Sequence, residues 1–246
     1  MRSHRSTVFI RNKDLGFFRY LFAFKVATVE QISRDIYPGL TLNAIRKRVN
    51  RMIDEGLISS QYEEDLAGKL VYTLGPRGLH DYILGGTHAR QEWRSANVSH
   101  DVTLVDIAHK LQSSAKVKLY YPEHLLKTGI GVASQLPLDL FRDLRPDGLA
   151  KLGFLNGDFH VAIEYEASFK KRSRYEAKFR AYQTSSDVAG VLYVSDDQEL
   201  ISYLKSTELK LTPAADSKFY YQSLSELLGG DDVKFVRADG GILTLN

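Results

Sequence analysis

Three carboxylates in the middle of this sequence have the spacing to act together: Asp147, Glu164 and Glu166. Residues 159–166 alternate loosely between apolar and polar types and are rich in Val, Ile, Phe and Tyr, which predicts a strand. Residues two apart in a strand point to the same face, so Glu164 and Glu166 share one. Residues 149–155 predict the preceding strand of a hairpin, and Asp147, at its start, could reach that face.

Carboxylates gathered in this way could hold a metal ion. Three of them at one edge of a sheet would repel one another strongly unless a cation lay between them, and hard oxygen ligands suit Mg²⁺. We therefore take Asp147, Glu164 and Glu166 as candidate metal ligands and candidate catalytic residues, with Lys170 as a candidate catalytic lysine. The alternative is structural: the two glutamates form a solvated face or pair with Lys and Arg side chains.

The same segment resembles the PD-(D/E)xK nuclease core, in which a Pro-Asp on one strand precedes a (D/E)-x-K on the next. The matching residues are Pro146-Asp147 and Glu164-Tyr165-Glu166, so a glutamate stands where the pattern has lysine. The resemblance implies a Mg²⁺-dependent nuclease whose metal activates a water molecule. The departure removes the residue that normally helps to position or deprotonate that water, a task that Lys170, or Lys178 on the following helix, would have to take over.

Bulk composition is that of an ordinary globular protein and excludes several kinds of chemistry. Of the 246 residues, 43% are hydrophobic and 26% are charged, as in typical soluble domains. The chain has no cysteine, which excludes disulfides, thiolate zinc sites and cysteine nucleophiles. The sequence also lacks a glycine-rich phosphate loop ending in Lys-Ser/Thr, so it does not predict an NTPase. Residues 1–15 lack the apolar core of a signal peptide, and we expect a cytoplasmic protein without a membrane span.

Charge is divided unevenly along the chain. The formal net charge is +3, but residues 1–90 hold 14 Lys and Arg against 9 Asp and Glu, a balance of +5. Residues 91–246 hold 19 and 21, a balance of −2. A basic first part joined to a slightly acidic second part indicates that nucleic acid contacts the first part.

The basic part has the element pattern of a winged helix-turn-helix. Periodicity predicts three helices, a β-hairpin and a fourth helix. The three helices span residues 14–24, 29–36 and 41 or 43 to 55. The hairpin pairs residues 57–62 with 70–74, and the fourth helix spans residues 77–84. Thr28 can cap the second helix, with Gln31 at the reciprocal position of a capping box. Gly56 is a helix stop, and Pro76 stands at the favoured first position of a helix.

The third predicted helix carries a polar face that suits a DNA groove. Its apolar residues, Ile45, Val49, Met52 and Ile53, fall on one face. Four cations and two amides lie opposite or on the flanks: Asn43, Arg46, Lys47, Arg48, Asn50 and Arg51. Such side chains neutralise phosphates and read base edges. The hairpin tip, Glu63-Glu64-Asp65, is acidic, so we expect little contact from the wing. A protein-docking module is the alternative for the same fold.

The remaining residues predict a second domain. Residues 10–86 would form the winged helix, 87–98 a linker and 99–246 an α/β domain. Its elements are helix 100–112, strands 117–121, 149–155 and 159–166, helix 173–183 and strand 188–194. This αβββαβ order agrees with the PD-(D/E)xK core. The expected fold class is α+β: an N-terminal winged helix-turn-helix followed by an α/β PD-(D/E)xK-like mixed-sheet domain.

The chain as a whole resembles the replication-relaxation family of bacterial plasmids and mobile elements. The residues that carry the resemblance are Val71-Tyr72-Thr73-Leu74, Gly78-Leu79, His100-Asp101-Val102, Arg145-Pro146-Asp147 and Ile163-Glu164-Tyr165-Glu166. Their ordered set is moderately specific and falls within roughly residues 10–195. The resemblance implies a winged helix joined to a nuclease-like domain, and a role in plasmid replication or transfer or its control.

Two functions are compatible with these observations. The first is a sequence-specific DNA-binding protein of a plasmid or mobile element, acting in replication, transfer or transcription control, with a degenerate nuclease-like domain. Its expected partners are double-stranded DNA and a second copy of the chain, and it needs no metal. The second is a Mg²⁺-dependent DNA endonuclease using Asp147, Glu164 and Glu166. We favour the first, because the motif lacks its lysine.

Overall fold

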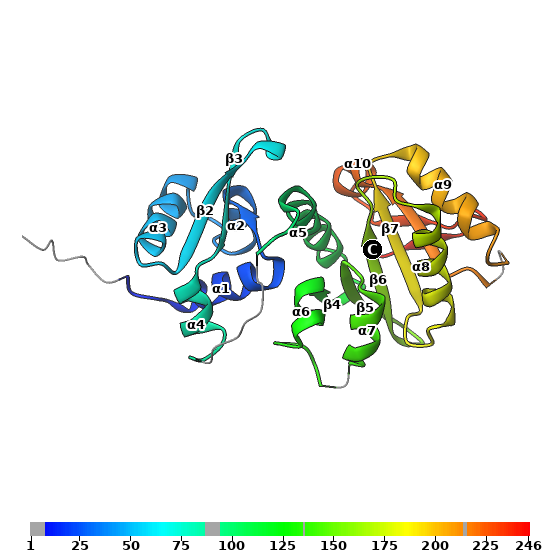
Figure 1. Cartoon of the computed structure of the whole chain (residues 1–246), viewed down its shortest axis with the longest axis horizontal. Helices are drawn as coiled ribbons and strands as arrows, with labels where there is room; N and C mark the ends of the chain where they lie inside the picture. Colours follow the sequence, from blue (N-terminus) through cyan, green and yellow to red (C-terminus); the bar gives the residue numbers. More distant parts are fainter. Residues whose placement is uncertain (1–7, 87–93, 135, 214–215) are drawn as a thin grey trace, which may run out of the picture. The chain divides into compact units, whose positions relative to one another are not determined.

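The computed structural model describes residues 8–86, 94–134, 136–213 and 216–246. The chain divides into two compact units, Met1–Val105 and Asp106–Asn246, with the boundary inside helix α5 (Val98–Gln112) (Figure 1). The predicted linker at 87–98 lies for the most part outside the described residues. Within those residues, every helix is too short or too polar to cross a membrane.

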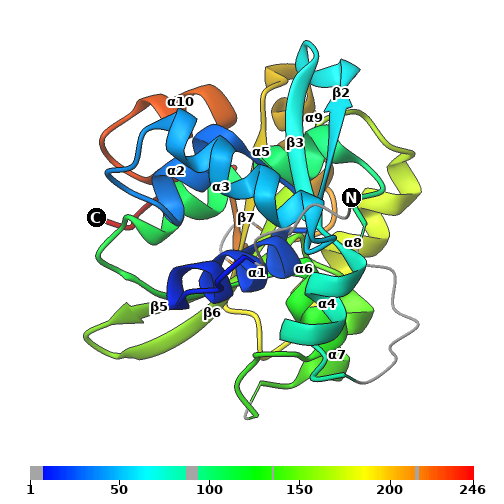
Figure 2. The same cartoon turned by 90° about the vertical axis from the view of Figure 1, so that its left-hand side faces the viewer.

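The first unit joins helices to a small antiparallel sheet. Its described elements are α1 (Asn12–Phe24), β1 (Ala27–Thr28), α2 (Val29–Asp35), α3 (Leu42–Asp54), β2 (Ile58–Glu63), the 3₁₀ turn η1 (Glu64–Leu66), β3 (Lys69–Leu74) and α4 (Pro76–Tyr82). The sheet order is β1-β3-β2. The β2–β3 hairpin projects beyond the helices (Figure 2), with a register running from Ile58 opposite Leu74 to Glu63 opposite Lys69. This is the element order of a winged helix.

Local sequence signals account for most of these boundaries. The hydroxyl of Thr28 accepts a hydrogen bond from the Gln31 amide at 3.3 Å, and the Gln31 side chain accepts one from the Thr28 amide at 3.0 Å. The predicted capping box is therefore confirmed. The Thr41 hydroxyl caps α3 by accepting a hydrogen bond from the Ala44 amide at 3.3 Å. Gly56, with φ of 70°, follows the end of α3 in the left-handed conformation that glycine favours.

A buried carboxylate ties α1 to the turn after α2 and to α3. Asp14 is fully buried. Its carboxylate accepts hydrogen bonds from the Tyr37 hydroxyl at 2.6 Å, the Arg11 amide at 2.6 Å and the Arg48 guanidinium. Burial alone would raise the pKa of Asp14, but these hydrogen bonds, with Arg48 foremost, outweigh burial and lower it. The ionised carboxylate therefore fixes the position of α3 in the first unit.

The second unit is built on a mixed sheet. Its strands are β4 (Val117–Pro122), β5 (Gly148–Phe154), β6 (Gly157–Tyr165), β7 (Gly190–Ser195), β8 (Phe219–Ser223), β9 (Lys234–Val236) and β10 (Ile242–Thr244), in the spatial order β10-β9-β8-β7-β6-β5-β4. The pairs β6–β7 and β7–β8 are parallel and the other pairs are antiparallel. The helices after α5 are α6 (Glu123–Thr128), α7 (Leu138–Leu144), α8 (Arg172–Thr184), α9 (Gln198–Leu209) and α10 (Leu224–Gly229).

The chain order α5, β4, β5, β6, α8, β7 confirms the predicted αβββαβ order and the α+β class. Two short helices, α6 and α7, lie between β4 and β5. Strand β7 is buried at every residue, as expected for a central strand covered on both faces.

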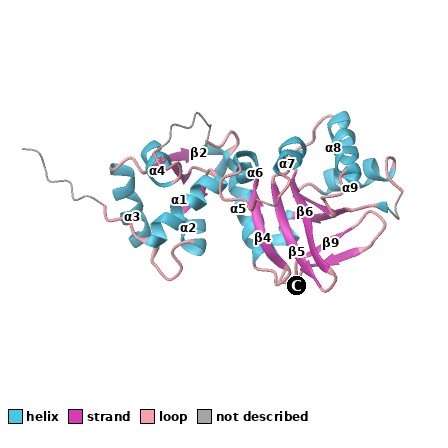
Figure 3. Ribbon diagram, turned by 90° about the horizontal axis from the view of Figure 1, so that it is seen from below, coloured by secondary structure: helices cyan, strands magenta, loops and turns pink. Residues whose placement is uncertain are grey.

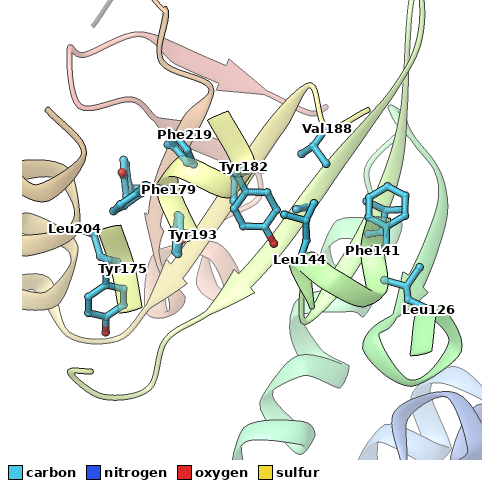
Figure 4. Packing of buried hydrophobic residues seen from close by; sticks show 14 of the residues in the cluster. Leu126, Phe141, Leu144, Tyr175, Phe179, Tyr182, Val188, Tyr193, Leu204 and Phe219 are labelled. Atoms are coloured by element: carbon cyan, nitrogen blue, oxygen red, sulfur yellow. The ribbon is translucent and has the colours of Figure 1, made fainter. Parts of the chain in front are cut away.

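Aromatic side chains dominate the core on one face of this sheet. Helices α7, α8 and α9 lie on the same side of the strands (Figure 3). Tyr175, Phe179 and Tyr182 of α8 are all fully buried, and the Phe179 ring meets that of Phe219 edge-on at 4.8 Å (Figure 4). Tyr175, Phe179 and Tyr182 are three or four residues apart, so they form the single inward stripe of α8. This stripe sets which side chains of α8 face the sheet.

We expect Asp14→Ala to lower the free energy of unfolding by about 3 kcal/mol, because it leaves Arg48 and the buried Tyr37 hydroxyl without their acceptor. Chemical denaturation followed by circular dichroism measures the change. Asp54→Ala is the control: Asp54 is exposed on α3, and its loss should change stability by less than about 0.5 kcal/mol. Equal denaturation midpoints for the two variants would contradict the role given to Asp14.

Candidate nucleic-acid interface and carboxylate site

Helix α3 separates an apolar face from a cationic one. Ile45, Val49 and Met52 are completely buried, so the helix is held by that side. Asn43, Arg46, Lys47, Asn50 and Arg51, five of the six predicted DNA-binding residues, are exposed. Across the described residues, the three cations among them take part in no ion pair. Their charges are thus available to an external partner.

Arg48, the sixth predicted DNA-binding residue, has a different environment. Its guanidinium pairs with buried Asp14 and donates to the Phe9 carbonyl at 3.1 Å. Asp14 raises the pKa of Arg48, so the pair stays ionised. The sequence placed Arg48 on the flank of the helix but could not show that a carboxylate 34 residues earlier would bind it. We therefore leave Arg48 out of the cationic face.

The β2–β3 hairpin carries acidic side chains at its tip. Glu63, Glu64 and Asp65 lie where β2 gives way to η1. The chain then turns through two left-handed residues, Ala67 with φ of 55° and Gly68 with φ of 70°. Carboxylates at the tip of a hairpin would be repelled by DNA phosphates, and little contact between this hairpin and DNA stays a prediction.

Asp147 lies at the start of β5, against the end of β6. One carboxylate oxygen accepts a hydrogen bond from the Tyr165 amide at 2.8 Å. Gly148 is opposite Ile163 in the antiparallel register, so the next pair outward is Asp147 and Glu164. The predicted hairpin thus brings the first two carboxylates to one edge of the sheet.

Glu164 is held by two side chains of α8. It is 1% exposed, and its carboxylate accepts hydrogen bonds from the Lys178 ammonium and the Tyr182 hydroxyl, one on each oxygen. Burial raises the pKa of Glu164 to about 8, Lys178 opposes this rise, and nearby Asp147 adds to it. Burial lowers the pKa of Lys178, but the carboxylates of Glu164 and Asp147 outweigh burial and raise it.

Glu166 follows β6 and is also buried, at 4% exposed. Lys170 is near it, with 3.7 Å between the Lys170 Nζ and a Glu166 carboxylate oxygen. Burial raises the pKa of Glu166, while Lys170 and Lys178 act in the opposite direction. Asp147 also raises this pKa. The four predicted catalytic residues, Asp147, Glu164, Glu166 and Lys170, therefore belong to one electrostatic cluster.

The donor set does not fit Mg²⁺ as it stands. Among the described residues, no group of three or more Asp, Glu or His side chains is arranged to hold a metal ion. Both oxygens of Glu164 already accept hydrogen bonds, and one oxygen of Asp147 binds a backbone amide. The structural alternative was that the glutamates form a solvated face or pair with Lys and Arg side chains, and Glu164 is paired with a lysine, Lys178.

Two tyrosines of this cluster were not among the predicted site residues. Tyr182 lies four residues after Lys178 on α8, which is the spacing that brings both to one carboxylate. Tyr193 lies opposite Glu164 in the parallel β6–β7 register, and its buried hydroxyl has no hydrogen-bond partner among the described residues. The helical spacing of Lys178 and Tyr182 was visible in the sequence, whereas the register that places Tyr193 was not.

Comparison with known proteins gives weak similarity only. No family model and no curated protein matches the chain, so the replication-relaxation resemblance stays a prediction. The chain is similar to the restriction endonuclease FokI, with a TM-score of 0.33, 12% identity and coverage of 87% of this chain and 43% of that chain. It is similar to FokI bound to DNA with a TM-score of 0.27 and 12% identity, covering 88% and 43%. The chain spans less than half the length of these structures, and TM-scores this low do not establish a shared fold.

The raised pKa of Glu164 predicts a pH dependence of stability. Between the ordinary value of 4.5 and about 8, the folded protein keeps a proton on Glu164 that the unfolded chain has released, and in that protonated form the carboxyl donates to the Tyr182 hydroxyl oxygen instead of accepting from it. The free energy of unfolding should therefore fall as pH rises through this window, by at most about 1.4 kcal/mol per pH unit from this group. Glu164→Gln should reduce that slope.

The measurement is chemical denaturation at a series of pH values from 4.5 to 8. The control is Glu199→Gln, which changes an exposed glutamate of α9 in the same way. For this control, the slope of the free energy of unfolding against pH should match that of the wild type. If Glu164→Gln also leaves the slope unchanged, the buried carboxyl does not hold its proton in the folded state.

Proposed function

We propose that this protein binds double-stranded DNA by placing α3 in the major groove, and that its second unit does not cut the strand. One observation carries the proposal. The outward face of α3 presents Arg46, Lys47 and Arg51 together with two amides, and these cations have no ion pair in the described part of the chain. A solvated face that served only the fold would not need so many unpaired cations.

The positions of the polar residues suit base recognition as well as phosphate binding. Asn43, Lys47 and Asn50 recur at intervals of four and three residues, so they form one stripe along α3. An asparagine amide can make two hydrogen bonds to adenine, and an arginine or lysine can bind the guanine edge. The remaining cations would contact phosphates, which position the helix without reading sequence.

The hydrogen bonds of Asp14 support the same proposal from inside the unit. A recognition helix must be held rigidly if its side chains are to meet particular base edges. Asp14 fixes α3 through Arg48, and Ile45, Val49 and Met52 anchor its buried side. The positive charge of Arg48 is paired with Asp14 inside the protein. The residues proposed to contact DNA are therefore Asn43, Arg46, Lys47, Asn50 and Arg51.

The finer biological assignment follows from the motif resemblance alone. A role in plasmid or mobile-element replication, transfer or transcription control is our prediction from that resemblance. The cytoplasmic location, the second copy of the chain as a partner and the domain limits 10–86 and 99–246 are further predictions, made from the sequence itself. In this assignment, the second unit is a nuclease-like domain in which Lys178 and Tyr182 donate hydrogen bonds to the two oxygens of Glu164.

A duplex-binding assay tests the proposal. We expect Lys47→Ala combined with Arg51→Ala to weaken binding to DNA selected from a random-sequence pool by about tenfold or more, because it removes two cations from the proposed interface. The slope of log K against log salt should also become shallower, by about 1 for each phosphate contact that is lost. Fluorescence anisotropy over a salt series measures both quantities.

The matched control also removes two cations, but away from α3. Arg19 on α1 and Lys210 at the end of α9 are exposed. Their double alanine variant should bind with nearly wild-type affinity. If both double variants lose affinity equally, binding reflects net charge, and α3 is not the interface. A binding constant that does not respond to salt would favour the protein-docking alternative.

The non-catalytic assignment of the second unit is tested by DNA cleavage. Because Glu164 is engaged by Lys178 and Tyr182, we expect supercoiled plasmid to remain intact when incubated with the protein and Mg²⁺ or Mn²⁺. Nicking by the wild type that disappears in Asp147→Ala would establish the alternative, a metal-dependent endonuclease. Asp187→Ala serves as the control for a carboxylate of the same unit that is exposed.

A further inference from the structure

The loop between β6 and α8 presents an aromatic side chain to solvent. Phe169 is 50% exposed, and its ring meets that of Tyr203 edge-on with 5.7 Å between the ring centroids. The Tyr203 ring in turn meets the buried Tyr175 ring edge-on at 6.0 Å. Phe169 is therefore connected to the core through aromatic contacts, while about half of its surface stays accessible to a ligand.

Hydrogen bonds hold this loop in place on both sides of the exposed ring. The Tyr175 hydroxyl accepts a hydrogen bond from the Lys170 amide at 3.0 Å and donates one to the Ser168 carbonyl at 3.4 Å. The Lys170 ammonium also donates to the Ser168 hydroxyl at 3.1 Å. Because the backbone next to Phe169 is already ordered, the ring would lose little conformational entropy when it contacts a ligand.

The same loop and the start of α8 are strongly cationic. Residues 167–174 hold four Lys and Arg and no Asp or Glu. Lys170 and Arg172 are each paired with a glutamate of the same unit. Lys171 and Arg174 are exposed, and neither takes part in an ion pair within the described ranges of the chain. Two positive charges close to the exposed ring are thus available to an anionic ligand.

The combination of a ring with cations separates Phe169 from other exposed aromatic residues, which are ordinary when they stand alone. Tyr62 on β2 is even more exposed, at 76%. The residues that follow it are the acidic Glu63, Glu64 and Asp65, and these would repel a polyanion. Phe169 is followed by cations, so a ligand with both a flat apolar group and negative charge fits its surroundings.

We propose that this loop binds single-stranded nucleic acid, with one base stacked on the Phe169 ring and the neighbouring phosphates at Lys171 and Arg174. An aromatic side chain can stack on any base, because every base has a π-face. In a duplex the bases already stack on one another, so the loop favours an unpaired strand. Arginine matches the geometry of a phosphate, with two parallel hydrogen bonds. This ligand differs from the duplex assigned to α3, and its site shares no residue with α3.

A comparison of ring and base by paired changes tests the proposal. The full chain carries Lys47→Ala and Arg51→Ala throughout, so that two exposed cations of α3 are absent. Fluorescence anisotropy measures its affinity for two labelled strands of equal length, an oligothymidylate and an abasic strand. Both strands carry the same charge, but only the first can stack. The oligothymidylate should bind about tenfold more tightly, and Phe169→Ala should remove that difference without weakening binding to the abasic strand.

Two further variants separate stacking from effects on the fold. Phe169→Trp should keep the preference for the oligothymidylate, since an indole ring also stacks on a base. Tyr62→Ala removes an exposed aromatic ring from the first unit and should leave both affinities unchanged. Melting temperatures show that each variant is folded. Equal affinity of the parent chain for the two strands, or equal weakening of both by Phe169→Ala, would overturn the stacking role. A duplex that binds as tightly as the single strand would overturn the preference for an unpaired strand.

The phosphate contacts are tested by salt dependence. Lys171→Ala combined with Arg174→Ala should make the slope of log K against log salt shallower by about 1.4, at about 0.7 for each phosphate contact on a single strand. Arg19→Ala combined with Lys210→Ala removes the same charge elsewhere and should leave the slope unchanged. An unchanged slope in the first double variant would overturn the assignment of the phosphates to the start of α8.

This site and the proposed function fail in different experiments. Retention of duplex binding by Lys47→Ala with Arg51→Ala would show that the α3 interface is wrong, and the comparison of the two single strands would still stand. Failure of that comparison would remove the loop site and leave duplex binding by α3 as it was.

Discussion

The cost of removing a carboxylate from water is the constraint on which both units depend. A buried Asp or Glu is tolerated only when charged or polar groups replace its hydration. The first unit meets this requirement for Asp14 with an arginine and a tyrosine, Arg48 and Tyr37. The second unit does so for Glu164 with a lysine and a tyrosine, Lys178 and Tyr182. In each unit the cation and the tyrosine come from other elements, so the carboxylate joins separate parts of the fold.

This constraint divides the charged residues into those used by the fold and those left for a partner. On α3, Arg48 forms an ion pair with Asp14, whereas Arg46, Lys47 and Arg51 remain exposed. In the carboxylate cluster the division runs the other way, because Lys178, one of the two lysines that could have served chemistry, is paired with Glu164. Asp147, Glu164 and Glu166 therefore lie close together, but Glu164 is already occupied by side chains of α8 and is not free to bind a metal ion. For this reason the proposed function assigns no DNA cleavage to the second unit.

Within the second unit, the turn that ends α7 combines a costly backbone conformation with an exposed side chain, that of Arg145. Arg145 precedes Pro146 and Asp147, so one short segment lines a cavity beside α6 and α7 and begins the strand that carries the carboxylate. Strained backbone is retained in proteins where the surrounding structure requires it or where a ligand benefits from it.

Much of the fold was determined by the sequence itself, because caps, stops and periodicity act over a few residues. Thr28 with Gln31, Thr41 and Gly56 set the limits of α2 and α3, and the alternation around Glu164 predicted β6. The sequence also showed that Asp147 could reach Glu164, since a hairpin leaves little choice of register. Only the tertiary structure decided which partner each charge would take. Arg48 finds Asp14 across 34 residues and Glu164 finds Lys178 across a strand-to-helix connection, and no local pattern encodes such pairings because they depend on which surfaces pack together.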